Sequence, residues 1–319
     1  MNRTNLLLLA AIAVALPLSL LAGRVWIDPF HPALAAAPAI LLELRLPRGV
    51  LALALGAGLG GAGAAMQGYL RNPLADPGLF GIAPGAALGA VLALLTGASA
   101  VYALPIAALV GAASAMALLA LIAGRTAGVT LFTLAGMMIA SLAGALTSLA
   151  ISLAPNPFAL SEIVTWLMGA LTDRGWPDVW IAAPPTLLGL AVLRFAGRDL
   201  DALTLGEDTA RSLGVEPRRV QALMIVGVGL TVGAGVAVAG IIGFVGLIVP
   251  HLVRRFTDRR PSQLIVPSAL AGALLVLVAD ALCRILPLAG GELRLGIGLS
   301  LLGGPFFLAL LLRMRRGLA

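Results

Sequence analysis

The chain is dominated by long apolar runs that are separated by short polar groups. Of its 319 residues 60% are hydrophobic and only 11% are charged, and its mean hydropathy is +1.05, whereas a soluble protein averages roughly 25% charged residues. A helix that spans a bilayer needs about 20 mostly apolar residues, and the runs divide into about ten such segments. We therefore expect one all-α, polytopic membrane domain over residues 1–319. The expected spans are 4–22, 47–68, 79–95, 101–123, 131–153, 178–196, 220–239, 241–254, 266–286 and 296–313.

The arginine residues indicate how the chain is threaded. The run at 4–22 is too long for a signal peptide and lacks a small-residue cleavage site, so we expect it to be the first span. An even number of spans places both termini on one side, and fifteen of the 21 basic residues, Arg125 among them, fall on that side. Because basic residues concentrate in cytoplasmic loops, we expect both termini in the cytoplasm and the chain in the bacterial inner membrane. The other six are Arg24, Arg45, Arg48, Arg174, Arg284 and Arg294.

The composition excludes several classes of function. All 21 basic residues are Arg, and without Lys the chain cannot form a GxxxxGK[ST] phosphate loop. Any ATP and Mg²⁺ would therefore be bound by another chain, and we expect no cofactor in this one. Cys283 is the single cysteine and His31 and His251 lie far apart, so we expect no metal site. The Arg residues sit between apolar spans and form no basic stripe, which argues against nucleic acid, and no catalytic residue is expected because neither GxSxG nor HExxH occurs.

Two apolar runs are interrupted. Residues 71–78 read RNPLADPG, and residues 240–250 read GIIGFVGLIVP. Interrupted segments survive at membrane depth only where they are buried or line a water-filled path, so we predict that both border a translocation pathway. Small residues also recur at helical spacing, which favours close packing of helices inside the bundle. They are Gly56 and Gly60, then Gly81, Gly85 and Gly89, then Gly229 and Gly233.

Five motifs occur in order along the chain. They are LRLPR at 44–48, GAAMQGYLRNPLADPGLFGIAPGAALGA at 63–90, LTLGEDTARSLGV at 203–215, GIIGFVGLIVPHLVRR at 240–255 and SALAGALLVLVADALCR at 268–284. With them the chain resembles, over nearly its whole length, the BtuC/FecCD family of permease subunits of binding-protein-dependent ABC importers for ferric siderophores, haem and vitamin B12. The resemblance implies a BtuC-like type II importer fold and a homodimer that encloses the path. It also implies two cytoplasmic ATP-binding subunits and a periplasmic substrate-binding protein as partners.

The stretch 205–214 is the clearest polar insertion, and the threading places it in the cytoplasm. Acidic residues in its first turn and Arg further along suit the dipole of a short helix. It resembles the coupling helix that docks on the ATPase in this family. The alternative is an ordinary solvent-exposed loop helix, which would have the same sequence pattern. The residues assigned to it are Leu205, Gly206, Glu207, Asp208, Ala210, Arg211, Leu213 and Gly214.

On the periplasmic side, the family uses arginines to meet acidic residues of the binding protein. The resemblance assigns this docking role to Arg45, Arg48 and Arg284. Exposed ion pairs contribute only about 0 to 1 kcal/mol each to binding. We therefore expect these arginines to guide the binding protein to its site and to fix its orientation there. For Arg284 the alternative is a local pair with Asp280, four residues earlier on the same helix.

A further group of residues is assigned to the translocation pathway: Gln67, Asn72, Pro73, Gly81 and Gly85. Polar side chains that face the interior of a membrane bundle are expensive and usually functional. Asn72 and Asp76 have a second interpretation as caps of broken helices, which we favour. One departure from the family is Arg294, which stands where a proline is usual.

Two rival functions are a proton-driven secondary transporter and a membrane scaffold without a transport role. A proton-driven machine needs titratable groups within the bilayer, and Asp280 is the one deeply placed carboxylate, with Arg284 as its potential partner. The motifs do not distinguish a ferric siderophore or haem from cobalamin, and iron complexes rank first only because they are the commonest cargo of the family.

Overall fold

The computed structural model describes residues 3–23, 26–27, 37–97, 102–124, 128–286 and 291–316, so that Arg24, His31 and Arg125 lie outside the described residues. All the elements within these ranges are helices. They are α1 (Arg3–Leu21), α2 (Ala37–Ala39), η1 (Ile40–Arg45), α3 (Leu46–Tyr69), η2 (Pro77–Phe80), α4 (Ile82–Leu95), α5 (Ala103–Ala123), α6 (Val129–Ser152), α7 (Pro157–Leu167), α8 (Trp176–Leu203), α9 (Glu207–Ser212), α10 (Pro217–Val228), η3 (Gly229–Gly233), α11 (Ala234–Ala239), α12 (Val245–Val253), η4 (Arg254–Phe256), α13 (Pro261–Ile285) and α14 (Leu295–Arg316).

The expected spans agree with the helices in position but not all in length. Within the described ranges, eight helices are long and apolar enough to cross a membrane. The spans expected at 79–95 and 241–254 correspond to shorter helices, because α4 has 14 residues and α12 has nine. The sequence analysis missed α7, which has only 11 residues and carries Glu162.

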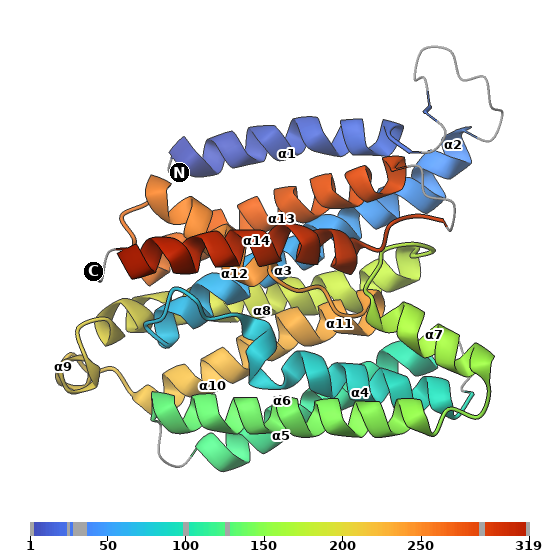
Figure 1. The fold of residues 1–319 in the computed structure, drawn as a ribbon. Helices are drawn as coiled ribbons and strands as arrows, with labels where there is room; N and C mark the ends of the chain where they lie inside the picture. Colours follow the sequence, from blue (N-terminus) through green and yellow to red (C-terminus); the bar gives the residue numbers. More distant parts are fainter. Residues whose placement is uncertain are drawn as a thin grey trace.

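The long helices lie side by side in one bundle (Figure 1). Both termini are at the same end, at the left of Figure 1, where α9 also protrudes, and we call it the terminal end. The other end, which carries α2 and α7, is called the opposite end. The expectation that both termini share one side is thus confirmed for the fold.

Helix α3 packs most closely at the centre, because its glycines let other backbones approach. A methyl group at Gly56 would overlap the carbonyl of Gly272 on α13, and one at Gly63 would overlap the carbonyl of Gly246 on α12. Gly89 meets α5 in the same way. These contacts confirm that the repeated small residues mark helix interfaces.

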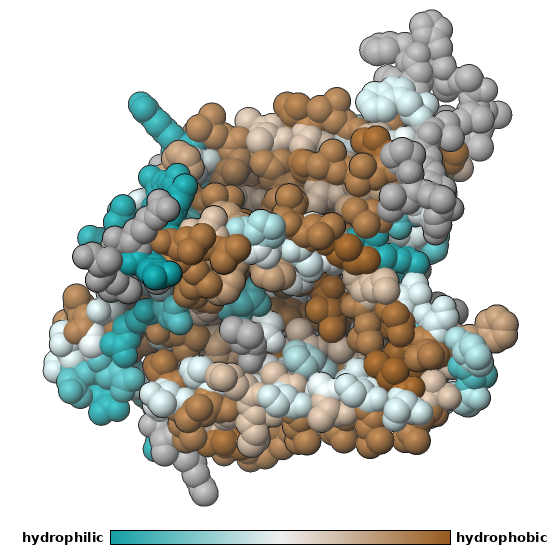
Figure 2. All heavy atoms as spheres, in the orientation of Figure 1, coloured by the Kyte–Doolittle hydropathy of each residue, from teal (hydrophilic) through white to brown (hydrophobic). Residues whose placement is uncertain are grey.

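The outer surface is apolar along the bundle and polar at its ends. Figure 2 shows hydrophobic residues over the flanks of the long helices and hydrophilic residues gathered at the terminal end. Large side chains such as Leu121 on α5 and Phe195 on α8 are exposed. A surface of this kind suits a protein whose flanks face lipid.

Candidate functional site

Two interrupted segments meet inside the bundle. Residues 70–81 turn between α3 and α4, and residues 240–244 leave helical geometry between α11 and α12, with positive φ at Gly240 and Phe244. The first turn of α12, which follows the second segment directly, touches the first segment, since a Cβ at Gly246 would lie only 2.6 Å from Cδ of Pro77. Both segments border one cavity of about 120 Å³, whose lining includes Asp76 and Gly243. The predicted interruptions are confirmed, and the fold brings them together.

Gln67 is buried and braces α3 against α12. Its amide nitrogen donates to the carbonyls of Gly246 and Leu247 at 3.3 and 3.4 Å, and its amide oxygen accepts from Nη2 of Arg254 at 3.0 Å. Because the whole amide is engaged within this subunit, the structure assigns Gln67 a bracing role. Its assignment to the pathway stays a prediction.

The polar residues of the 70–81 turn bond to its backbone: Asp76 caps η2, as the favoured interpretation had it, whereas Asn72 closes the turn and caps no helix. Oδ1 of Asn72 accepts from the N–H of Leu74 at 2.9 Å, and Oδ1 of Asp76 accepts from the N–H of Gly78 at 2.8 Å. The turn is therefore held by its own side chains.

The other residues assigned to the pathway serve packing or line a different hollow. Pro73 is half-buried in the 70–81 turn. Gly81 has a positive φ of 79° and lies against Ile139 of α6. Gly85 packs on α5 and borders an apolar groove of about 640 Å³ between α4, α5 and α6. Whether any of the three faces the path is untested.

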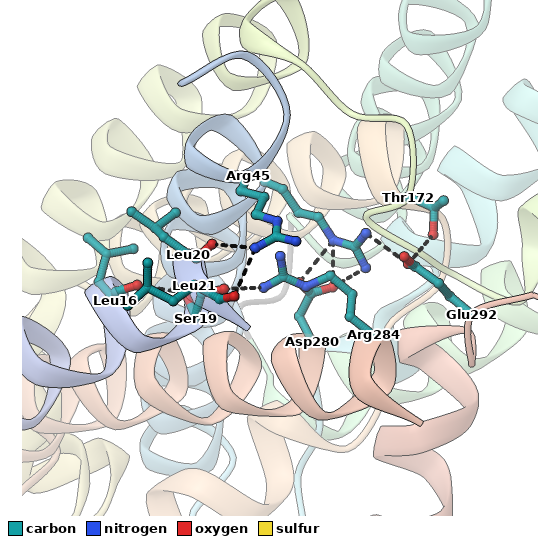
Figure 3. A network of polar contacts seen from close by, with 10 residues as sticks. Leu16, Ser19, Leu20, Leu21, Arg45, Thr172, Asp280, Arg284 and Glu292 are labelled. Carbon is teal, nitrogen blue, oxygen red and sulfur yellow. Dashed lines mark hydrogen bonds and ion pairs between the residues drawn. The ribbon is translucent and has the colours of Figure 1, made fainter. Parts of the chain in front are cut away.

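A buried charge network ties α3, α13 and the loops that carry Thr172 and Glu292 together at the opposite end (Figure 3). Nε and Nη2 of Arg48 on α3 donate to the Asp280 carboxylate on α13 over 2.9 to 3.1 Å, and Nη1 donates to Glu292 at 2.8 Å. Glu292 also accepts from Thr172 at 3.4 Å. Asp280 is 1% exposed, and Nε of Arg284 lies 3.4 Å from its Oδ2. The alternative interpretation of Arg284, an ion pair with Asp280, is confirmed.

Two arginines of this network also hold the end of α1. Nη2 of Arg284 donates to the carbonyl of Ser19 at 3.0 Å, and Nη1 of Arg45 donates to the carbonyls of Leu20 and Leu21 at 2.8 and 3.0 Å. The last four carbonyls of a helix lack partners within it, and a cation there is favoured by the helix dipole. Two of the three arginines that the resemblance assigned to an external partner thus bind the last carbonyls of α1.

The same network borders a cavity of about 350 Å³ at the opposite end. The charged residues in its lining are Arg45, Arg48, Arg174 and Arg284, with Asp173 and Glu292. Because Arg48 and Arg284 are only 9% and 4% exposed, an acidic partner would reach them through this cavity and not on an open surface. The docking role of the three predicted arginines remains a prediction.

Helix α9 forms a small exposed knob at the terminal end. Glu207 and Asp208 lie in its first turn and Arg211 in its last, as predicted. Ala210 is its buried anchor, and the flanking Gly206 and Gly214 have φ values of 103° and 84°. Leu205 and Leu213, one at each flank of the helix, are both 63% exposed.

A contact that the sequence analysis missed joins the base of this knob to α13. The Asp201 carboxylate at the end of α8 accepts from the N–H of Ser262 at 2.8 Å and from its hydroxyl. It therefore caps the N-terminus of α13, whose Pro261 suits a first helical position. Pro261-Ser262 signals a helix start in the sequence, but the capping residue lies 61 positions away.

Known proteins match this chain over almost all of its length. The model of the FecCD transport family matches residues 8–313. The uncharacterized ABC transporter permease protein YvrB of Bacillus subtilis is 39% identical over 285 residues, which cover 87% of this chain and 80% of YvrB. The vitamin B12 import system permease protein BtuC of Salmonella typhimurium is 37% identical over 311 residues, which cover 96% and 93% of the two chains.

A solved structure agrees with the fold. It is described as an inward-facing conformation of a metal-chelate type ABC transporter, and it matches with a TM-score of 0.89 and 31% sequence identity over 97% of this chain and 98% of that one. The chain, a multi-pass ABC importer permease, therefore belongs to the FecCD transport family.

Proposed function

We propose that this chain is the membrane subunit of an importer that carries an iron complex or cobalamin from the periplasm to the cytoplasm, driven by ATP hydrolysis on separate subunits. The observation that carries the proposal is the meeting of two interrupted segments around one cavity inside the bundle. Non-helical backbone at such depth is tolerated where it lines a path. The relatives named for vitamin B12 and for a metal chelate support a large metal-containing cargo.

The exposed face of α6 supports a path shared by two copies of the chain. Small residues repeat along it at helical spacing and are exposed: Ser141, Gly144, Ala145 and Ser148. Figure 2 shows weakly polar residues in a row along this helix, on a molecule whose flanks are otherwise apolar. A face of small, weakly polar residues is better suited to line a wide path that binds its cargo weakly than to contact lipid. We therefore propose that it faces the second copy across the pathway.

Helix α9 is proposed to receive the motion of the ATPase. A short helix with a buried anchor and two exposed leucines is suited to a groove on a partner. Asp201 links its base to the first turn of α13, so a displacement of α9 is carried into a long helix of the bundle. The termini and α9 would then lie in the cytoplasm, in agreement with the arginine distribution.

The arginine-lined cavity at the opposite end is proposed to receive acidic side chains of a periplasmic binding protein. The network has three arginines against Asp280 and Glu292, which leaves a net positive charge. Charge of one sign in a hollow steers an oppositely charged partner and fixes its register.

The proposal is tested with proteoliposomes that hold the permease, its ATP-binding subunit and its binding protein. Radiolabelled ferric siderophore, haem and cobalamin are supplied in turn, with and without ATP. We expect uptake of one cargo that requires ATP, requires the binding protein and survives a protonophore. Uptake without nucleotide, or its loss with the protonophore, would favour a proton-driven transporter, and no uptake of any cargo would favour a scaffold.

A further inference from the structure

A second cationic hollow lies at the terminal end, away from α9. It is a groove of about 110 Å³ between α12 with η4 on one side and α14 on the other. The charged and polar residues in its lining are His251, Arg255 and Arg313, and the apolar ones are Phe306, Ala309 and Leu310. Neither the proposed pathway nor the proposed coupling helix uses these residues.

Among the residues that the structure describes, none neutralises the positive charges of this groove. Arg255 and Arg313 are exposed, and across the part of the chain that the structure describes neither makes a hydrogen bond or an ion pair. His251 lies within electrostatic range of both guanidinium groups. Its Nδ1 is buried, and among the described residues it has no hydrogen-bond partner. The groove therefore offers cationic and polar groups to a ligand from outside the chain.

The floor of the groove is apolar. The ring of Phe306 packs edge-on against His251 with centroids 5.7 Å apart, and Leu310 is buried beside it. Leu302, one turn before Phe306 on the same face of α14, is exposed, so the apolar wall of the groove continues along the helix. A ligand that fits it carries both an anionic group and a hydrocarbon part.

The depth of the groove matches the boundary between hydrocarbon and headgroups. From Leu295 to Leu312 helix α14 carries no charge, and Arg313 is its first charged residue, so we place Arg313 where the hydrocarbon core ends. Arginine binds phosphate oxygens through a rigid fork of donors, and basic residues just outside a membrane helix attract anionic lipids.

We propose that this groove binds the phosphate of an anionic phospholipid, with an acyl chain along the wall formed by Phe306 and Ala309. The phosphate would lie between Arg255 and Arg313, within reach of His251. An acidic surface of a partner protein would satisfy the two arginines equally well, but it would leave the apolar wall unused. The proposal does not depend on the cargo or on the orientation of the chain.

The test is lipid retention by the full-length permease in native mass spectrometry, after delipidation and titration with phosphatidylglycerol or phosphatidylcholine. We expect phosphatidylglycerol to be retained preferentially. Replacing Arg255→Gln or Arg313→Gln should weaken its binding about fivefold each, and both together on the order of thirtyfold, because each basic residue near a membrane surface contributes about 1 kcal/mol. The matched control is Arg219→Gln, an exposed arginine at the same end that lies outside the groove.

A second variant keeps both charges and fills the hollow. Ala309→Trp should also lower phosphatidylglycerol retention, which separates a shaped site from general attraction to charge. Equal retention of the two lipids, or unchanged retention in the double arginine variant, would overturn the proposal. So would displacement of the lipid by millimolar inorganic phosphate, which would indicate a site for the free anion. Loss of ATPase co-elution with lipid retention unchanged would assign the groove to a protein partner instead.

Discussion

At the opposite end of the bundle Arg48, Asp280 and Arg284 are buried and pair with one another, whereas at the terminal end α9 is exposed and has a single buried side chain. Asp280 is 1% exposed and bonds to two arginines. Leu205 and Leu213 beside α9 are each 63% exposed, so both side chains are available for contact with a partner. The same chain thus places its strongest internal interactions where the sequence predicted docking, and its most accessible apolar groups where the sequence predicted coupling.

The difference follows from the cost of burying charge. Removing an ion from water costs several kcal/mol, and the cost is offset only while every partner is present. A network of this kind fixes α1, α3 and α13 to one another. By contrast, α9 is stabilised by few contacts and keeps its surface for a partner. Effects of substitution on folding should therefore fall from the opposite end to the terminal end.

The largest effect is expected for Asp280→Ala. It leaves the buried guanidinium group of Arg284 without a carboxylate and that of Arg48 with Glu292 alone, which should lower the free energy of unfolding by about 3 to 5 kcal/mol. The measurement is the melting temperature of the detergent-solubilised permease, followed by the loss of the monodisperse peak in size exclusion. The control is Asp208→Ala on α9, which removes an equal charge from an exposed position. Equal melting of the two variants would show that the network does not hold the bundle.

A smaller effect is expected for Asp201→Ala at the base of α9. This substitution removes the cap of α13, and loss of an N-terminal cap costs about 0.5 to 2 kcal/mol. Amide hydrogen exchange should quicken in the first turn of α13, beginning with the N–H of Ser262. Asp199→Ala on the same helix is the matched control, because Asp199 forms no hydrogen bond with the described residues. Unchanged exchange in Asp201→Ala would contradict the capping role.

Much of the fold could be predicted because hydropathy and helix length are local properties. The interrupted segments could be located for the same reason, since Pro and Gly disrupt a helix wherever they occur. Helix α7 was missed because its 11 residues are too few for a span. The position of α12 was predicted correctly, but its length was overestimated. The non-helical segment 240–244 before it is as apolar as the nine-residue helix that follows.

The candidate site could be predicted only in part, because its partners are distant in sequence. Arg284 and Asp280 are four residues apart on one helix, so their pair was foreseen. Arg48 and Asp280 are 232 positions apart, and no spacing rule connects them. The bonds from Arg45 to the end of α1 were missed for the same reason. The polarity of α9 is local, and there the predicted charges were confirmed.

A modest effect on stability, with a measurable effect on docking, is expected for Glu292→Gln. The side chain is partly exposed, so loss of its charge should cost no more than about 1 kcal/mol. The arginine-lined cavity becomes more positive, and we expect an acidic binding protein to associate a few-fold faster at low salt. Stopped-flow association at low and high ionic strength measures this, because salt screens the difference. Arg45→Gln should act in the opposite direction, and a common direction for both would argue against docking at this cavity.

The smallest effect on folding, with a large effect on assembly, is expected for the double variant Leu205→Ser and Leu213→Ser. Both side chains are exposed, so stability should change by less than about 0.5 kcal/mol. If α9 docks on the ATPase, the leucines become buried, and their loss should weaken that association on the order of thirtyfold or more. Pull-down of the ATP-binding subunit measures this, with Phe256→Ser as an exposed apolar control at the same end. If both variants retain the ATP-binding subunit equally, α9 is an ordinary solvent-exposed loop helix and not a docking element. The two ends of the bundle would then differ only in how deeply their side chains are buried.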